Sequence, residues 1–206
     1  MGPIGGLNTD ACVFCTRREQ PTPLFETSSL YAMPDKFPMR PGHTLLISKE
    51  HLSCLAAAPD LMPELEEATA RVRGFLERSY GGPVLAFENG IAGQTVFHAH
   101  LHLLPSRISE IPAELLGHDD ITRVEGWGGV HERFAREGHY RYAELGGKRY
   151  AIAGYSPVLR PARRLLAEAT GLVWGEHGFA KETSVEDVRD LERRWYAWTC
   201  GSVASP

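Results

Sequence analysis

Three histidines alternate with apolar residues in the segment Phe97-His98-Ala99-His100-Leu101-His102-Leu103-Leu104. Side chains alternate between the two faces of a strand, so His98, His100 and His102 are expected on one face. Neutral imidazole is a nucleophile, a proton carrier and a metal ligand near neutral pH. This row therefore allows one histidine to bind a metal, the next to attack a substrate and the third to bind developing negative charge. The alternative is a polar strand face that happens to be rich in histidine. It is disfavoured because histidine is scarce and buried polar groups need partners.

A second group of reactive side chains is the pair Cys12 and Cys15, which forms a C-x-x-C, whereas Cys54 and Cys200 are isolated. In a reducing compartment such a pair is more often a metal clip or a redox pair than a disulfide. The N-terminal residues lack the features of a secretory signal, and no apolar run approaches the roughly 18 residues needed to span a bilayer. We therefore expect a cytoplasmic protein with no membrane partner.

The elements that must position these residues can be predicted from hydrophobic spacing and turn residues. In the first half, strands are predicted over Tyr31–Met33, Thr44–Ser48, Val84–Phe87 and Thr95–Leu104, and a helix over Pro59–Tyr80. On the last strand, the face that begins at Phe97 is expected to be buried.

The second half carries weaker signals. The segment Gly126–Gly129 is predicted to be a loop, and Gly146-Gly147 to join a hairpin of Tyr140–Leu145 and Arg149–Ala153. Helices are predicted over Pro161–Thr170 and after a Ser184 cap, the latter with an apolar face of Val185, Val188, Leu191, Trp195 and Trp198.

Composition limits the classes of partner. The chain has 206 residues, 43% hydrophobic and 23% charged, as in ordinary globular domains. Its 22 Lys and Arg against 26 Asp and Glu give a net charge of −4. No global positive field exists to recruit DNA or RNA, so an anionic ligand must be held by a local site.

In combination, these motifs resemble those of the histidine triad family. The segment His98–Leu104 matches the motif His-φ-His-φ-His-φ-φ, where φ is apolar, and Pro41–His51 resembles the family's Pro-Gly-His strand with its following Lys-x-His. The segment Asn89–Val96 is similar to the Asn-x-Gly…Gly-Gln-Ser/Thr sequence that precedes the triad, and Cys12–Cys15 to the cysteine pair of zinc-carrying members. The resemblance covers about half of the chain.

The resemblance implies an α+β fold built on an antiparallel sheet flanked by helices, and we expect the C-terminal hairpin and helices to pack on it. It divides the chain into a nucleotide-binding domain over residues 1–110 and an extension over 111–206. A homodimer is expected because family members commonly form one. No linker-like segment separates the two halves, so the extension is expected to pack on the same core.

The resemblance also implies a metal site. Cys12, Cys15, His51 and His98 would form a closed Cys₂His₂ set of the kind that binds structural zinc. Nickel and iron remain open by ligand type. A reduced cysteine pair beside unrelated histidines is the alternative.

For the chemistry, the resemblance implies that His100 attacks the α-phosphorus of a nucleotide to form a nucleotidyl-histidine, which water then hydrolyses. His102 would bind a phosphate oxygen and stabilise the transition state. The neighbouring contacts are expected from Asn89, Gly93, Gln94 and Thr95 at the phosphate and leaving group, and from Asp35 at the ribose hydroxyls.

Three classes of function remain open. The first is a nucleotide hydrolase acting on a dinucleoside polyphosphate, a phosphoramidate or a related nucleotidyl substrate. The second is a nucleotidyl transferase or phosphorylase, although such relatives typically carry Gln where this chain has His102. The third is a non-catalytic, zinc-stabilised nucleotide-binding module or a nucleic-acid end processor, disfavoured by the retention of His100 and by the acidic charge balance.

Overall fold

The computed structural model describes residues 9–91, 93–111, 121–152 and 181–201, with side chains of the last helix described from residue 185. The helices are α1 (Val13–Thr16), α2 (Met62–Tyr80), α4 (Trp127–Glu137) and α6 (Lys181–Thr199), with short 3₁₀ turns η1 (Thr9–Ala11), η2 (Leu55–Ala57) and η3 (Pro59–Leu61). The strands are β1 (Phe25–Glu26), β2 (Leu30–Pro34), β3 (Thr44–Ser48), β4 (Val84–Glu88), β5 (His100–Pro105), β6 (Ile121–Val124), β7 (Arg141–Leu145) and β8 (Lys148–Ile152).

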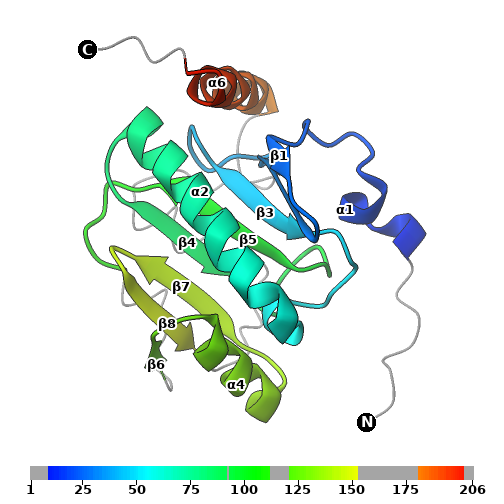
Figure 1. Ribbon diagram of the computed structural model, residues 1–206. Helices are drawn as coiled ribbons and strands as arrows, with labels where there is room; N and C mark the ends of the chain where they lie inside the picture. Colours follow the sequence, from blue (N-terminus) through cyan, green and yellow to red (C-terminus); the bar gives the residue numbers. More distant parts are fainter. Residues whose placement is uncertain (1–8, 92, 112–120, 153–180, 202–206) are drawn as a thin grey trace.

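All these strands form one sheet in the order β1-β2-β3-β5-β4-β7-β8-β6. Every neighbouring pair is antiparallel. Helix α2 crosses one face of the sheet, with α4 and α6 at either side of it (Figure 1). This arrangement confirms the predicted α+β class. Among the described residues, no helix has the length and apolar character that a bilayer crossing requires.

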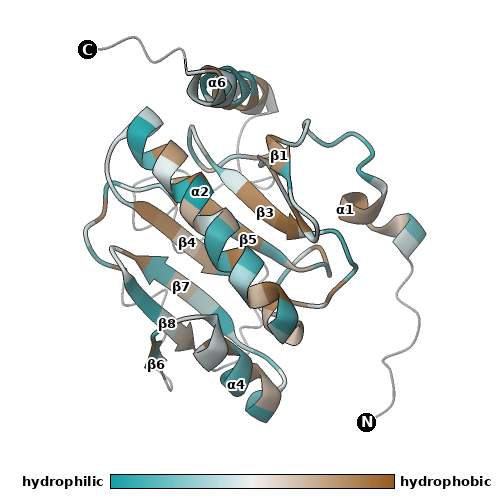
Figure 2. Ribbon diagram, in the orientation of Figure 1, coloured by the Kyte–Doolittle hydropathy of each residue, from teal (hydrophilic) through white to brown (hydrophobic). Residues whose placement is uncertain are grey.

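Strand alternation sorts the central strands into two faces. Leu101 and Leu103 of β5 join the core beneath α2, together with Leu46 of β3. The alternate residues His100 and His102 therefore face the opposite side of the sheet. In Figure 2, β3 and β4 are mainly hydrophobic, whereas α2 alternates between hydrophobic and polar residues, as expected for a helix with one face on a sheet. The buried leucines thus fix the register that presents the two histidines.

The histidine segment differs from its prediction at its start. The strand was expected from Thr95, but β5 begins at His100, because the chain before it turns and the His98 N–H donates to the Val96 carbonyl. The expectation that Phe97 is buried is wrong, since 60% of this residue is exposed. Only two of the three histidines therefore lie on the strand itself.

The predicted loop at Gly126–Gly129 is also wrong, because α4 begins at Trp127. Trp127 and Val130 are buried and give this helix an apolar face despite its glycines. A Cβ at Gly129 would lie 2.9 Å from a methyl group of Val124. The glycine therefore lets α4 approach β6, a close contact rather than a break in the helix.

The hairpin around Gly146-Gly147 is confirmed by β7 and β8. In α6, Leu191 and Trp195 are buried as predicted, but Val185 is exposed. The predicted Pro161–Thr170 helix and the Ser184 side chain lie outside the described residues. Strands from both sides of residue 110 share the sheet, and the division into two domains there remains a prediction.

Phe75 of α2 offers a test of this packing. Its fully buried ring lies edge-on to Trp195 of α6, with 4.9 Å between ring centroids. We expect Phe75→Ala to lower the free energy of unfolding by about 3–5 kcal/mol, because it leaves a cavity between the helices and the sheet. Urea unfolding measures the change. The exposed Glu77→Ala in the same helix is the control, and an equally small loss in both variants would contradict the packing.

Candidate active site and metal centre

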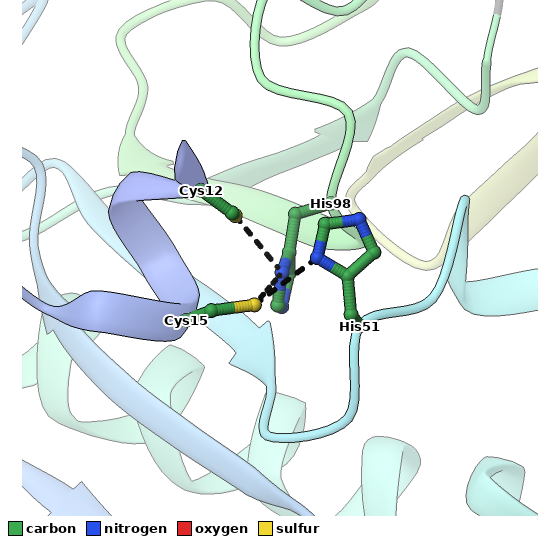
Figure 3. Close-up of side chains that lie close together, drawn as sticks. All are labelled: Cys12, Cys15, His51 and His98. Carbon is green, nitrogen blue, oxygen red and sulfur yellow. Dashed lines mark hydrogen bonds between the residues drawn. The ribbon is translucent and has the colours of Figure 1, made fainter. Parts of the chain in front are cut away.

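Four potential metal ligands meet beside the sheet (Figure 3). Cys12 caps α1, Cys15 lies within it, His51 follows β3, and His98 precedes β5. Their ligand atoms all lie within 4.8 Å of one another. His98 Nδ1 lies 3.4 Å from each sulfur atom, and His51 Nδ1 lies 3.1 Å from the Cys15 sulfur.

These distances fit a tetrahedral metal site. Zinc bonds of ordinary length imply about 3.6 Å between neighbouring sulfur and nitrogen ligands. The His98 Nε2–H donates to the Ser48 carbonyl at 2.7 Å, which leaves the lone pair of Nδ1 directed at the thiols. Burial lowers the pKa of His98 to about 4 and, with Cys12 nearby, raises that of Cys15 to about 11. A neutral His98 and a protonated Cys15 are therefore favoured unless a cation compensates the Cys15 thiolate.

Two anchors hold α1 against the sheet. The Tyr31 hydroxyl of β2 donates to the Phe14 carbonyl at 2.9 Å. The Phe14 ring lies edge-on to both His98 and His100, at centroid distances of 5.7 and 5.2 Å. The segment of α1 and its cap thus carries two of the potential metal ligands and one wall of the histidine site.

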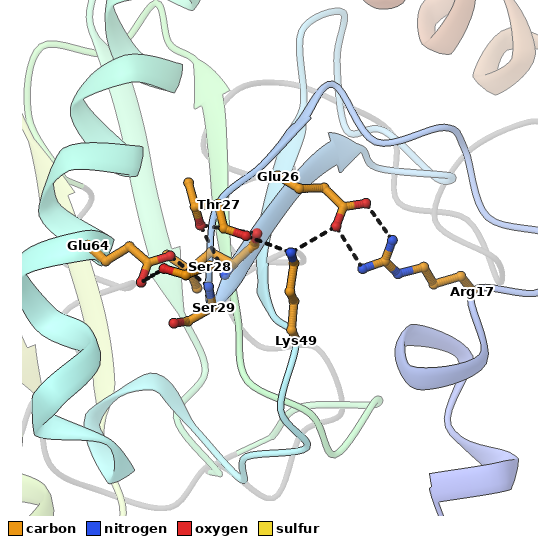
Figure 4. A network of polar contacts seen from close by, with 8 residues as sticks. Arg17, Glu26, Thr27, Ser28, Ser29, Lys49 and Glu64 are labelled. Carbon is orange, nitrogen blue, oxygen red and sulfur yellow. Dashed lines mark hydrogen bonds and ion pairs between the residues drawn. The ribbon is translucent and has the colours of Figure 1, made fainter.

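A surface network ties together the segments that bear these ligands (Figure 4). Glu26 of β1 pairs with Arg17, just after α1, at 2.7 Å and with Lys49, which leads into His51, at 3.0 Å. Lys49 also donates to the Thr27 carbonyl at 2.6 Å. The two cations lower the pKa of Glu26 to about 2. The Lys-x-His noted in the sequence therefore fastens the His51 loop to the edge of the sheet.

A cavity of about 310 Å³ lies next to this cluster. Among its lining residues are Asp35, Asn89, Gly93, Thr95, His100 and His102, which are most of the predicted substrate contacts. The cavity is also lined by residues that no predicted role covers, among them Val13, Phe14, Lys36, Phe37 and Leu45. For Val13 and Phe14, the available signal was their position between the two cysteines, where α1 must cross the site.

His100 is held in one tautomer. Its Nδ1 lies 2.6 Å from the His98 carbonyl, an acceptor only, so Nδ1 carries the proton and the lone pair is on Nε2. His98, whose carbonyl accepts this bond, is also one of the four potential metal ligands. An imidazole fixed in this way has its nucleophilic nitrogen defined in advance of substrate binding.

His102 is held in the complementary state through His43, which directly precedes β3. The Met39 N–H donates to His43 Nδ1 at 3.1 Å, so the His43 proton is on Nε2. This Nε2 lies 3.1 Å from His102 Nδ1 and donates to it. The remaining proton of His102 is therefore on Nε2, where it can be donated to an anion. The Phe87 ring stacks on His102 at 4.4 Å and fixes its plane.

Asp35 lies at the junction of this pair and the cavity. Its Oδ2 is 3.6 Å from His43 Nε2 and 3.7 Å from His102 Nδ1, and its Oδ1 accepts the Phe37 N–H at 2.7 Å. Asp35, His43 and His102 are residue types that bind metals, and their potential ligand atoms lie close together. The Met39 N–H argues against one, because it occupies the His43 lone pair and leaves a proton where a metal would bind.

In the segment Asn89–Thr95, which precedes the triad, some residues line the cavity and others are buried in hydrogen bonds to the protein. Asn89 is buried, and its Oδ1 has no hydrogen-bond partner among the described residues. Gly93 has φ of +101°, which favours glycine, and Thr95 is exposed at the cavity. Gln94 differs from the expected nucleotide contact: its amide is buried and donates to the Ser53 carbonyl at 2.7 Å.

Comparison with known proteins agrees with these motifs. The HIT domain family model matches residues 17–108. An uncharacterised HIT-like protein of Saccharolobus solfataricus is 30% identical over 102 residues, covering 46% of this chain and 73% of that protein. The chain therefore belongs to the histidine triad (HIT) family.

Two relatives have named activities. The adenosine 5′-monophosphoramidase of Saccharomyces cerevisiae is 35% identical, over 47% of this chain and 63% of that protein. The adenylylsulfatase of Arabidopsis thaliana is 31% identical, over 47% and 52%. Among solved structures, a hypothetical histidine triad nucleotide-binding protein of Sulfolobus tokodaii is 30% identical, with a TM-score of 0.43 over 49% of this chain and 72% of that one.

The tautomer of His102 can be tested directly. We expect His102 to be protonated on Nε2 in the wild type and to populate both tautomers in His43→Ala, because the donor to Nδ1 is removed. Long-range ¹H–¹⁵N correlation spectra of the histidine rings distinguish the two forms. His139→Ala, which removes a ring bonded only locally to the Glu137 carbonyl, is the control. A wild-type His102 protonated on Nδ1 would refute the row of hydrogen bonds from Met39 through His43 to His102.

Proposed function

We propose that the protein is a nucleotide hydrolase that cleaves its substrate at the α-phosphorus through a covalent nucleotidyl-His100 intermediate. The single observation that carries this proposal is the tautomer of His100, whose Nδ1–H is donated to the His98 carbonyl. The lone pair on Nε2 belongs to a residue that lines the cavity. Covalent catalysis requires such a neutral, oriented nucleophile.

The reaction proceeds in two displacements. His100 Nε2 forms a bond to the α-phosphorus, while the bond to the leaving group breaks with its electron pair on that group. Water then displaces His100, and loss of one proton to solvent gives the nucleoside monophosphate and restores neutral imidazole. Throughout, His102 Nε2–H donates to a phosphate oxygen and stabilises the charge that develops there. Asn89, Gly93 and Thr95 surround the phosphate, and Asp35 binds the ribose hydroxyls.

The names of the relatives support the substrate class. A monophosphoramidase and an adenylylsulfatase both release a group from the phosphate of an adenylyl moiety. We propose a nucleoside phosphoramidate, a dinucleoside polyphosphate or a related nucleotidyl compound for this chain. Transfer to another acceptor is the alternative outcome, and binding without catalysis is the second. The products and the covalent label described below separate these three.

We further propose that Cys12, Cys15, His51 and His98 bind one structural zinc ion. The four donors and their distances support it. When bound, the metal would supply a fixed cross-link with no open position for water, and it would compensate the charge of the two thiolates. The chain's own contribution is the Ser48 carbonyl that orients His98 and the α1 turn that pairs the cysteines.

The remaining proposals concern location and partners. The four free cysteines support a reducing, cytoplasmic location, since thiolate ligands persist there. A nucleotide is the proposed small-molecule partner, with neither nucleic acid nor membrane. In the described sheet the outer strands are β1 and β6, so a homodimer formed by sheet pairing would use one of them. Analytical ultracentrifugation tests the oligomeric state.

Metal removal provides the next prediction. We expect about one zinc ion per chain in the purified protein and none in Cys12→Ser, which removes one of four ligands. The variant should have a lower melting temperature, because metal binding is coupled to folding of α1 on the sheet. Elemental analysis and thermal unfolding measure both effects, with Cys200→Ser as the exposed control. A metal-free wild type of full stability would exclude the site.

The covalent step provides the fourth prediction. His100→Ala should lose at least about 10³-fold in kcat, since removal of a nucleophile abolishes the covalent path. It should keep its fold and bound metal. Wild-type protein mixed with an α-³²P-labelled substrate and rapidly denatured should carry acid-labile label, and His100→Ala should carry none. His102→Gln keeps the nucleophile and should accumulate label. An undiminished rate in His100→Ala would be fatal to the mechanism.

A further inference from the structure

Tyr140 connects the second half of the sheet to loops of the active site. It lies between α4 and β7, is fully buried, and donates its hydroxyl proton to Glu88 Oε2. Glu88 is the last residue of β4 and directly precedes Asn89. The other carboxylate oxygen of Glu88 accepts the Leu55 N–H at 2.9 Å, and the Tyr140 hydroxyl oxygen accepts the Ala56 N–H at 3.1 Å. Two side chains therefore bind the start of η2 to the end of β4.

The backbone of Tyr140 binds the turn that bears Asn89. Its N–H donates to the Gly90 carbonyl at 3.3 Å, continuing the β4–β7 pairing beyond Glu88. Gly90 has φ of +41°, and a Cβ there would lie 2.5 Å from the Tyr140 carbonyl oxygen and 2.8 Å from its ring. The turn and the tyrosine are thus in direct contact, with no space for a side chain between them.

Residues 53–57, which include η2, connect Tyr140 to the loop Gly93–Thr95. The Ser53 carbonyl accepts the Gln94 amide, which lies between Gly93 and Thr95 of the cavity. On its other side, α4 adds a second bond from the C-terminal half, since His131 Nδ1 lies 2.8 Å from the Ala56 carbonyl and donates to it. Both cavity loops therefore depend on hydrogen bonds that end at residues 131 and 140.

A sheet does not need this arrangement for stability. Glu88 is 2% exposed, and burial raises the pKa of its carboxyl to about 7 against the lowering effect of Tyr140 and the Leu55 N–H. A buried carboxyl that loses a partner is strongly destabilising, and an apolar pair of similar size is often no less stable. What the pair adds is a defined geometry, because each hydrogen bond has one direction.

We propose that Tyr140 is a positioning residue for the reaction: with Glu88 it fixes the Asn89 turn and the Gly93–Thr95 loop around the phosphate. The second half of the sheet is then part of the catalytic apparatus and acts through these loops rather than through contact with substrate. This inference rests on the proposed hydrolase function.

The chain contains a matched control for this proposal. Tyr142, two residues further along, is also buried and also donates its hydroxyl to a buried carboxylate, Glu144, at 2.8 Å. Glu144 pairs with Arg73 and Arg149 on the α2 side of the sheet. Tyr140→Phe and Tyr142→Phe thus each remove a buried hydroxyl that donates to a carboxylate, but only the Tyr140 hydroxyl also bonds η2 and the end of β4.

Both variants should lower the melting temperature, and Tyr140→Phe should do so more, because it also removes the acceptor of the Ala56 N–H, whereas Glu144 keeps Arg73 and Arg149. Tyr140→Phe alone should lower kcat by about 10- to 100-fold, since small displacements of positioning groups reduce rates by such factors. Its KM should change less than about threefold, because Asp35 at the nucleoside end is unaffected and the loss falls on transition-state contacts. Equal kcat in the two variants, whether retained or reduced, would overturn the proposal.

Hydrogen exchange separates this inference from the hydrolase proposal. Peptides covering residues 53–58 and 87–91 should exchange faster in Tyr140→Phe than in Tyr142→Phe, whether or not the wild type hydrolyses any nucleotide tested. Unchanged exchange would overturn the positioning role. If Tyr140→Phe fails to fold, His131→Ala removes the milder of the two bonds to η2. This variant should lower kcat less than Tyr140→Phe does and should leave KM unchanged. An unaltered kcat would count against the proposal.

Discussion

The hydrogen bond from His100 Nδ1 to the His98 carbonyl is the constraint on which the site depends. His98 contributes its side chain to the proposed metal site and its carbonyl to the proposed nucleophile, so one residue joins the two centres. A displacement of the His98 backbone would move this carbonyl, and His100 would then lose the bond that sets its orientation and tautomer. The proposed metal site can therefore affect His100 through the backbone of His98, without contact with substrate.

A second row of hydrogen bonds orients His102, whose Nε2–H is a donor at the cavity. The backbone N–H of Met39 determines the tautomer of His43, and His43 determines that of His102. The direction of each bond follows from a backbone group that can only donate or only accept. The two triad histidines thus present opposite functions, a lone pair on His100 and a proton on His102.

The sequence allowed the central elements to be predicted because their signals are local. A short apolar run identified β3, alternation identified β5, and the helical spacing of apolar residues identified α2. Residue types and motifs also identified six of the fifteen residues that line the cavity. The direction of the Gln94 amide could not be predicted, because it depends on where the Ser53 carbonyl lies after folding. The same holds for α4: its glycines indicate a loop locally, and only the proximity of Val124 explains Gly129. Nothing local distinguishes Tyr140 from Tyr142, since both are aromatic residues of one predicted hairpin.

The position of the hairpin gives the second half of the chain its relation to the site. Strand β4 has β5, with the two histidines, on one side and β7 on the other. An unpaired β4 would end at solvent, and its last residue would be free to fray together with the turn that follows. Pairing with β7 removes that freedom along Ala86–Glu88. The hydrogen bond from the Tyr140 N–H to the Gly90 carbonyl extends the pairing by two residues into the turn. Edge protection and positioning of the Asn89 turn are therefore consequences of the same strand pairing.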